Sequence, residues 1–358
     1  MTYLQDKTIL VTGGTGSLGQ TLVRRMLSGN EMGSPRKVIV FSRDEAKQHA
    51  MKVAWQKQNV MTDDVFYNNF RNRLEFRIGD VRDYADVCSA VKHTDIVVHA
   101  AALKQVPVSE YFPMQAVMTN ITGAHNIVRA IEEHGYPVQT VIGISTDKAC
   151  KPVNVMGMTK ALQERVFQAA NILAPATRFV CVRYGNVLAS RGSVIPLFLD
   201  QIAQGGPVTI TLPEMTRFLM SLDRAVDTVL AALADAKPGE TYVPLSPSAT
   251  VHHIAKALIG ERPIDIRING MRPGEKLHEI LVSDEEAHHA YRRDDYYVIR
   301  PMLPELAARD EVATPLSGEY GSADHVLDLA GTIELLRSHQ LLPEQRERAA
   351  AIGQDLLR

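Results

Sequence analysis

The stretch Thr12-Gly13-Gly14-Thr15-Gly16-Ser17-Leu18-Gly19-Gln20 follows a short β-branched run, Thr8–Thr12, and leads into a helical pattern, Leu18–Ser28. Its spaced glycines permit a tight turn, close approach of backbone to a ligand, and close packing of helix on strand. The helix N-terminus adds N–H groups and the positive end of a dipole, which suit phosphates. We therefore predict that this turn binds a dinucleotide. The expected contacts are Gly13, Thr15, Gly16, Ser17, Leu18 and Gly19.

Outward from this turn, short β-branched runs alternate with longer helical patterns. The expected strands are Thr8–Thr12, Lys37–Ser42, Leu74–Gly79, Ile96–His99, Val138–Ile144 and Arg178–Arg183, and the expected helices include Leu18–Ser28, Asp44–Gln58, Pro113–His134 and Asn154–Leu173. Such alternation builds βαβ units, so it predicts an α/β fold with a Rossmann-type, doubly wound parallel sheet. Ligands of such sheets bind beyond the carboxyl ends of the strands.

The alternation loosens after about residue 190, where Gly205-Gly206-Pro207 and the loop Met271–Lys276 interrupt it. We interpret residues 1–190 as the dinucleotide-binding domain and 191–310 as a smaller α/β lobe that binds substrate. Residues 311–358 form a C-terminal extension with an amphipathic helix, Leu327–Leu336. Later segments are expected to cross back into the first domain.

Composition narrows the function classes. Lys and Arg number 39 against 41 Asp and Glu, a formal charge of −2, and no basic stripe argues for nucleic acid. The three cysteines are far apart and form no CxxC pair, and the histidine pairs form no metal-ligand constellation, so we expect no metal. No apolar run is long enough to span a membrane and no signal peptide opens the chain, so we expect a cytoplasmic protein.

The end of the second strand bears on which dinucleotide is bound. An acidic residue there would accept the ribose hydroxyls of NAD, whereas Ser42 and Arg43 suit the 2′-phosphate of NADP. NADP is therefore expected; the alternative is that Arg43 is a solvated charge and Asp44 contacts the ribose. Further contacts are expected from Asp80 and Val81 at the adenine and from Ala100 and Ala101 along the cofactor.

The fifth strand ends in Ser145-Thr146-Asp147-Lys148, which places an acid and a base at the carboxyl edge of the sheet. Asp147 could donate a proton to a leaving hydroxyl. Lys148 could remove a proton from carbon if desolvation or a neighbouring charge lowered its pKa. Lys160 follows on the next helix and could face the cofactor ribose. The alternative for each lysine is a solvated charge.

Eight ordered motifs resemble a known family. They are TGGTGSLG, SRDEAKQ, GDVRD, HAAALKQVP, STDKA, VRYGNVLASRGSVIPLF, TRFLM and RPGEKLHE, between about residues 8 and 285. Together they resemble the extended short-chain dehydrogenase/reductase superfamily and, within it, the UDP-N-acetylglucosamine 4,6-dehydratases of bacterial surface-polysaccharide biosynthesis. The segment Ser317-Gly318-Glu319-Tyr320 also fits the inverting, 5-epimerising branch. The product implied is a UDP-2-acetamido-2,6-dideoxy-4-hexulose.

The resemblance implies a chemistry for the acid–base pair. NADP⁺ takes hydride from sugar carbon 4, Lys148 removes the carbon-5 proton, and Asp147 protonates the departing carbon-6 hydroxyl. NADPH then returns the hydride to carbon 6. The superfamily's Tyr-x-x-x-Lys falls on Met156 to Lys160, so its usual base is missing. Thr146, Lys160 through a water, Asp147 and Lys148 are the candidate substitutes.

The resemblance also implies residues for the sugar nucleotide. Asn186, Arg217, Arg272 and Glu275 correspond to positions that hold the UDP moiety, Val194 and Pro196 would wall the uracil, and Lys104 would contact substrate near the nicotinamide. A homo-oligomer, a dimer or hexamer, is expected through Pro113–His134 and Asn154–Leu173. Three alternatives remain: a sugar-nucleotide 4-epimerase, a 5,6-dehydratase, and a non-catalytic NADP-binding homologue.

Overall fold

The computed structural model describes residues 2–29, 32–57, 70–188, 190, 193–306 and 314–345. Gln58 of the second expected helix, Gly192 of one quoted motif, and residues 311–313 and 346–358 of the expected extension lie outside these ranges. In the part of the chain that the structure describes, no helix is long and apolar enough to cross a membrane.

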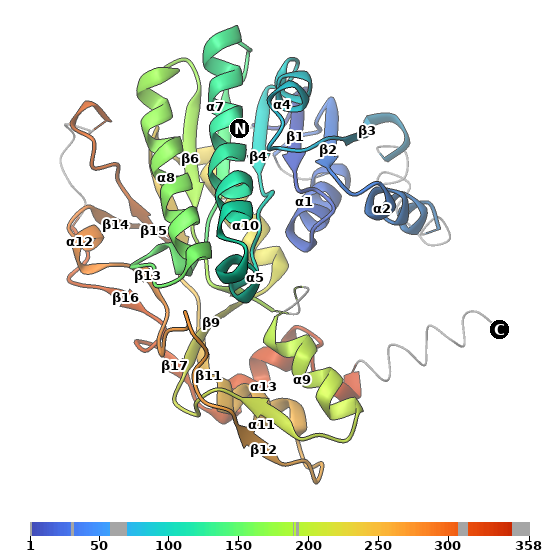
Figure 1. Cartoon of the computed structure of the whole chain (residues 1–358), viewed down its shortest axis with the longest axis vertical. Helices are drawn as coiled ribbons and strands as arrows, with labels where there is room; N and C mark the ends of the chain where they lie inside the picture. The colour runs from blue at the N-terminus through green and yellow to red at the C-terminus, as the bar shows by residue number, and fades with distance from the viewer. Residues whose placement is uncertain are drawn as a thin grey trace.

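A nine-stranded sheet forms the centre of the molecule (Figure 1), in the order β14-β15-β10-β6-β5-β4-β1-β2-β3. Its strands are β1 (Thr8–Thr12), β2 (Lys37–Ser42), β3 (Leu74–Ile78), β4 (Ile96–His99), β5 (Thr140–Ile144), β6 (Arg178–Val182), β10 (Thr241–Pro244), β14 (Ala290–Arg293) and β15 (Tyr296–Ile299). The strands from β10 through β3 run parallel. β15 pairs antiparallel with both β10 and β14, so it alone of the nine runs in the opposite direction. The prediction of a Rossmann-type α/β fold is confirmed.

The central strands are apolar along their whole length because helices cover both faces of the sheet. Every residue of β1 and β5 is buried, for example. One face packs on α1 (Ser17–Leu27), α2 (Glu45–Lys57) and α10 (Leu222–Asp235). The other packs on α4 (Tyr84–Val91), α7 (Gly123–His134) and α8 (Val155–Leu173). Such two-sided burial is typical of parallel sheets.

The expected helix Pro113–His134 is helical throughout but is not uniform. It begins as α6 (Pro113–Ala116), widens to one π-helical segment, η2 (Val117–Thr122), and continues as α7. The short helix α5 (Val106–Tyr111) precedes it. A π-helical turn admits an extra residue into the helix and is often found at functional sites.

A second lobe lies below the carboxyl ends of the parallel strands in Figure 1. It contains the sheets β17-β11-β9-β7 and β12-β8 and packs three helices into a separate core. The helices are α9 (Val194–Ala203), α11 (Val251–Ile259) and α13 (Leu329–Ser338); the strands are β7 (Asn186–Val187), β8 (Val208–Ile210), β9 (Thr216–Met220), β11 (Ser248–Thr250), β12 (Ile266–Ile268) and β17 (Val326–Leu327). The strands β13 (Ile280–Val282) and β16 (Tyr320–Gly321) pair separately, and α12 (Asp284–Ala287) follows β13.

The chain crosses between these two parts more than once. After β9 it returns to the large sheet through α10 and β10, leaves again for β11 and α11, and returns for β14 and β15. Each crossing passes the carboxyl edge of the parallel strands. Residues distant in sequence therefore meet at that edge.

Candidate active site

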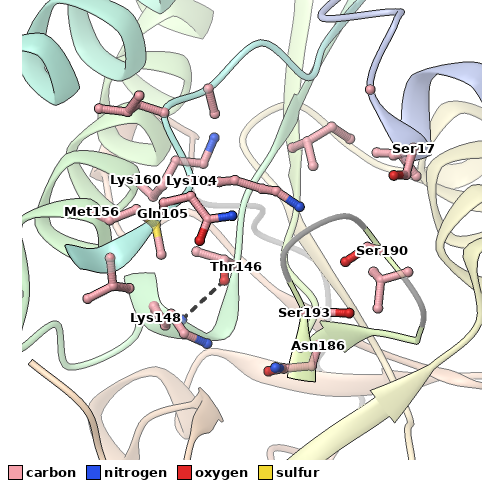
Figure 2. Close-up of a pocket in the computed structure, with 18 of the residues that line it drawn as sticks. Ser17, Lys104, Gln105, Thr146, Lys148, Met156, Lys160, Asn186, Ser190 and Ser193 are labelled. Atoms are coloured by element: carbon pink, nitrogen blue, oxygen red, sulfur yellow. Dashed lines mark hydrogen bonds between the residues drawn. The ribbon is translucent and has the colours of Figure 1, made fainter. Parts of the chain in front are cut away.

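A cavity of about 1000 Å³ lies between the carboxyl edge of the parallel strands and the second lobe. Residues from both sides line it, as Figure 2 shows for part of its wall. Of the sequence-predicted site residues, all line the cavity except Asp80. The structure thus gathers the glycine turn, the acid–base pair and the predicted sugar-nucleotide residues around one space. Among the described residues, no group of three or more metal-ligating side chains occurs.

The glycine turn forms one end of the cavity. Gly13 has φ of +67°, and a Cβ there would lie 2.8 Å from the backbone of Ala101. A Cβ at Gly19 would lie 2.6 Å from the backbone of Gly14. Gly16 begins α1 without a side-chain cap, so the first N–H groups of the helix have no side-chain acceptor among the described residues. These features fit a pyrophosphate seated on the helix N-terminus.

The end of β2 forms the adjacent wall. The Ser42 hydroxyl accepts a hydrogen bond from Gln48 at 3.0 Å, so the hydroxyl is held in a fixed place. Arg43 and Lys47 both line the cavity, and Lys47 also pairs with Asp44 at 2.7 Å. Arg43 and Lys47 therefore place two positive charges beside Ser42, where the sequence predicted binding of a ribose 2′-phosphate.

Asp80, which was expected at the adenine, is not among the residues that line the cavity. Its carboxylate pairs with Arg82 at 2.6 Å and lies 3.7 Å from Arg43, outside the cavity lining. Burial raises the pKa of Asp80, but the contacts with Arg82 and Arg43 outweigh it and leave the pKa below its ordinary value. Its neighbour Val81 lines the cavity.

Asp147 is fully buried at the cavity wall, in the short turn η3 (Asp147–Ala149) after β5. Its Oδ1 accepts from the Thr146 hydroxyl at 2.9 Å and from the Lys148 amine at 3.0 Å. Its Oδ2 has no hydrogen-bond partner within the described residues. Burial, reinforced by the charge of Glu279 and opposed by Lys148, raises the pKa of Asp147. A carboxyl with a raised pKa is suited to donate a proton.

Lys148 lies between two carboxylates. Its Nζ is 3.0 Å from Asp147 and 3.2 Å from Glu279. Burial lowers the pKa of Lys148, but Asp147 and Glu279 outweigh burial, so the pKa is raised above its ordinary value. The sequence-based condition for a basic Lys148, a lowered pKa, is therefore not met. The reason is Glu279, which sequence reasoning did not bring to this place.

Met156 and Lys160 lie on the first turns of α8 and face the cavity beside Gln105 and Thr146 (Figure 2). Both side chains are nearly fully buried. Lys160 Nζ donates to Gln163 at 2.7 Å. Burial lowers the pKa of Lys160 to about 8. The sequence left open which face of the helix carries Lys160, and the structure turns it inward.

Lys104 extends into the cavity from the loop after β4 (Figure 2). Burial lowers its pKa. Asn120, in the π-helical segment η2, fixes this loop: its Oδ1 accepts from Leu103 N at 2.8 Å, and its Nδ2 donates to Leu103 O at 3.1 Å and to Thr159 at 2.9 Å. The π-helical turn thus has a local function, because it directs Asn120 toward the loop.

The second lobe contributes the remaining wall. Arg217 is buried, donates to the carbonyls of Thr216 at 2.7 Å and Leu277 at 3.3 Å, and approaches Glu279 at 3.9 Å. Arg272, in contrast, is exposed. The predicted residues that line this wall are Asn186, Val194, Pro196, Arg217, Arg272 and Glu275. Hydrogen bonds hold the Arg217 guanidinium in a fixed place, whereas the exposed Arg272 side chain is accessible to a ligand.

The cavity can now be compared with known proteins. A family described as "Polysaccharide biosynthesis protein" matches residues 9–301. The chain belongs to this family. A protein named UDP-glucose 4-epimerase from Rickettsia conorii is 46% identical over 301 residues, which is 83% of each chain. The family places the chain among the nucleotide-sugar-modifying enzymes of the extended short-chain dehydrogenase/reductase superfamily.

Solved structures agree on the fold. Pen from Bacillus thuringiensis matches with a TM-score of 0.83 and 33% identity, over 95% of this chain and 99% of that one. DesIV, a dTDP-glucose 4,6-dehydratase from Streptomyces venezuelae solved with NAD, matches with a TM-score of 0.64 and 23% identity, over 75% and 86%. Proteins that share this fold therefore carry both epimerase and dehydratase names.

Sequence reasoning missed several residues that line or shape the cavity. They are Lys47, Gln105, Asn120, Ser190, Ser193 and Glu279. Glu279 stands inside the motif RPGEKLHE, but nothing in the motif distinguishes its role from that of Glu275. Only Asn120 had a local signal, a polar side chain within an otherwise apolar helical face.

Proposed function

We propose that this enzyme is a UDP-N-acetylglucosamine 4,6-dehydratase that works by internal hydride transfer through NADP. The observation that carries the proposal is the fully buried Asp147, hydrogen-bonded to Lys148 beside Met156. Loss of water from carbons 5 and 6 needs an acid for the leaving hydroxyl and a base for the carbon-5 proton. A 4-epimerase needs neither. Both reactions need a base for the carbon-4 hydroxyl, which the Met156 thioether cannot supply, so the acid–base pair is what favours the dehydratase.

The residues of the cavity account for each proton. A dinucleotide held at the glycine turn would supply the hydride acceptor for carbon 4 and the hydride donor for carbon 6. Thr146 accepts the carbon-4 hydroxyl proton and passes its own to Asp147 through their 2.9 Å hydrogen bond. Lys148, as the neutral amine, takes the carbon-5 proton while Asp147 gives its proton to the departing carbon-6 hydroxyl, so that a carbon–carbon double bond forms as water leaves. Lys148 finally returns the proton to carbon 5.

This sequence ends with Asp147 ionised and Lys148 neutral, as it began, so one water is lost with no net oxidation. The raised pKa of Asp147 suits this carboxyl to donate a proton to the leaving hydroxyl. The raised pKa of Lys148 makes it a strong base once neutral, and it predicts that activity falls as the pH is lowered through that pKa.

NADP is favoured over NAD by the charge at the end of β2. Arg43 and Lys47 both line the cavity there, and Ser42 is held by Gln48. A 2′-phosphate would gain charge-assisted hydrogen bonds at this place. The acidic alternative, Asp44, is already paired with Lys47.

We further propose that the second lobe binds the UDP moiety. Arg272 supplies a planar fork for the diphosphate at the cavity rim, and Glu275 suits ribose hydroxyls. Asn186 also faces this space, with an Oδ1 that has no hydrogen-bond partner in the part of the chain described. Inversion at carbon 5 is favoured by the match of residues 317–320 to the inverting branch.

A 4-epimerase is the second candidate, because relatives with 46% identity carry that name. One assay separates the two. The purified enzyme is incubated with UDP-N-acetylglucosamine in deuterated water, and product is followed by mass and proton NMR. Loss of one water, a new methyl signal and deuterium at carbon 5 are expected, and the couplings report inversion or retention.

Three outcomes would contradict the proposal. A product of unchanged composition, inverted at carbon 4, would establish an epimerase, and no conversion with dinucleotide bound would indicate a non-catalytic homologue. An exocyclic alkene in place of the methyl group would indicate a 5,6-dehydratase. Lys148→Ala should abolish turnover and leave dinucleotide bound. Lys151→Ala, at an exposed lysine three residues on, serves as the control and should retain activity.

A further inference from the structure

Glu279 reaches the catalytic pair from the opposite wall of the cavity. It lies just before β13, far from β5 in sequence, and its side chain is 2% exposed. Its Oε1 is 3.2 Å from Lys148 Nζ, while Asp147 holds the same nitrogen at 3.0 Å from the other side. The amine is therefore held between one carboxylate of the large sheet and one of the second lobe.

The backbone of Glu279 is held by Ser322, the residue that follows strand β16. Its N–H donates to the Ser322 hydroxyl at 2.9 Å, and its carbonyl accepts from Ser322 N at 2.7 Å. The Ser322 hydroxyl also hydrogen-bonds Thr216 at 2.7 Å. These contacts leave the carboxylate little freedom to turn away from Lys148.

A purely structural ion pair would satisfy both oxygens of a buried carboxylate. Here Glu279 Oε2 is buried with no hydrogen-bond partner among the described residues, and Glu279 lines the cavity. Asp147 Oδ2, on the other side of the Lys148 amine, is also buried with no hydrogen-bond partner among the described residues. Leaving buried carboxylate oxygens unsatisfied costs stability, so the arrangement calls for another explanation.

We propose that Glu279 is a positioning residue that holds the Lys148 amine beside Asp147 and stabilises the positive charge formed when that amine takes a proton from substrate. The inference rests on the proposed function, in which Lys148 receives the carbon-5 proton. The charge that develops on Lys148 lies 3.2 Å from a fixed negative charge. Such preorganised charge is effective because it needs no rearrangement during the reaction.

The charges around the Lys148 amine have the signs that this role requires. Asp147 and Glu279 favour the protonated amine, whereas burial and Arg217 oppose it, and the balance raises the pKa of Lys148. Burial raises the pKa of Glu279, but Lys148, Arg217 and Lys276 outweigh it and keep the carboxyl ionised. His278, adjacent in the chain, bonds Thr216 at 2.8 Å.

The test compares Glu279→Gln with wild type in two measurements. The first is the ionisation of Lys148, measured without turnover by competitive acetylation across pH and quantification of the Lys148 peptide by mass spectrometry. The second is the pH profile of kcat and KM with UDP-N-acetylglucosamine. We expect the Lys148 titration to move to lower pH by about one unit, since an opposite charge this close shifts a pKa by at least that much.

In the kinetic measurement, the acidic limb of kcat should move with the titration. Maximal kcat should fall at least tenfold, because the charge on Lys148 is no longer stabilised, while KM stays within about twofold. Glu279→Asp keeps the negative charge but moves it farther from Lys148, so the shift in the Lys148 titration should be smaller. Asp284→Asn, five residues on and exposed, removes an equal charge and should change neither measurement.

An unshifted Lys148 titration in Glu279→Gln would overturn the inference. Thermal melting of each variant checks that a change does not arise from misfolding, and the Glu279→Asp variant repeats the test if Glu279→Gln is unstable. The two proposals fail separately. A shifted titration in an enzyme without dehydratase activity would support the role of Glu279 and reject the reaction.

Discussion

Lys160 shows how the surroundings of one residue set its chemistry. It is 5% exposed on α8, and burial lowers its pKa from 10.5 to about 8. The unfolded chain therefore binds a proton below about 10.5, whereas the folded protein binds it only below about 8. Between these values the unfolded state holds more protons, so stability rises with pH, and below 8 the full penalty, roughly 3 kcal/mol, applies.

We predict that Lys160→Met loses this pH dependence. In protein stripped of dinucleotide, the stability of wild type relative to Lys160→Met should rise by up to about 3 kcal/mol between pH 8 and 10.5. The lost hydrogen bond to Gln163 adds a constant and leaves the slope unchanged. Chemical denaturation across pH measures the difference. Lys52→Met, at an exposed lysine of α2, is the control; equal slopes for Lys160→Met and wild type would contradict the argument.

At this scale, sequence reasoning succeeded where chemistry is local in the chain. Asp147 and Lys148 are adjacent and follow a buried strand, so their place at the sheet edge could be predicted. Glu279 could not be, because its approach depends on how β13 packs against η3. The pairing of Asp80 with Arg82, outside the cavity lining, was likewise not expected from the sequence.

At the scale of elements, α8 must pack closely on the turn that carries the acid–base pair. Gly157 makes this possible, because a Cβ there would lie 2.2 Å from the carbonyl oxygen of Lys148. Gly157→Ala should gain about 1 kcal/mol of helix propensity but lose about 1–3 kcal/mol to overpacking. We predict lower stability and a kcat at least tenfold lower, because the turn has to move.

Thermal melting and steady-state kinetics test this prediction. Gly318→Ala is the matched control, since a Cβ there meets nothing within 4 Å. It should leave stability and kcat near wild type. If Gly157→Ala retained both as well, close packing of α8 on the turn would not be required for activity.

Element type was predictable wherever apolar runs were continuous. The strands of the first half begin and end within two residues of the predicted positions, and burial on both faces makes the central runs, such as β1 and β5, continuous. The π-helical segment η2 was not predicted. The segment is only six residues long, too short to show a period of its own, and its effect appears only when Asn120 meets Leu103.

At the scale of the whole molecule, strand order depended on contacts that sequence did not reveal. We expected later segments to return to the first domain, but the sequence did not show which segments would do so. The strands β14 and β15 join antiparallel beyond β10 because their own pairing forms a hairpin that β10 extends. Short strands of this kind, four residues each, carry little periodicity to read.

The remaining question at this scale is assembly, for which we propose a homo-oligomer formed through one apolar face. This face is defined by Tyr111, Phe112, Met114, Met118, Met158 and Leu162, all exposed, on α5, η2, α8 and the start of α6. Figure 1 shows α5 and α8 on the same side of the molecule, and the two helices are in contact. Met158 and Leu162 are one helical turn apart, as are Met114 and Met118, so each pair lies on one side of its helix.

We predict that Leu162→Glu dissociates this assembly. In a symmetric interface each substitution acts twice, so the change buries two unpaired charges in apolar surroundings, which costs several kcal/mol. Light scattering coupled to size exclusion should give a dimer or hexamer for wild type and a smaller species for Leu162→Glu. Ile268→Glu, at an exposed residue of β12 in the second lobe, should keep the wild-type mass. A monomeric wild type, or an unchanged mass in Leu162→Glu, would show that a second copy does not cover this face.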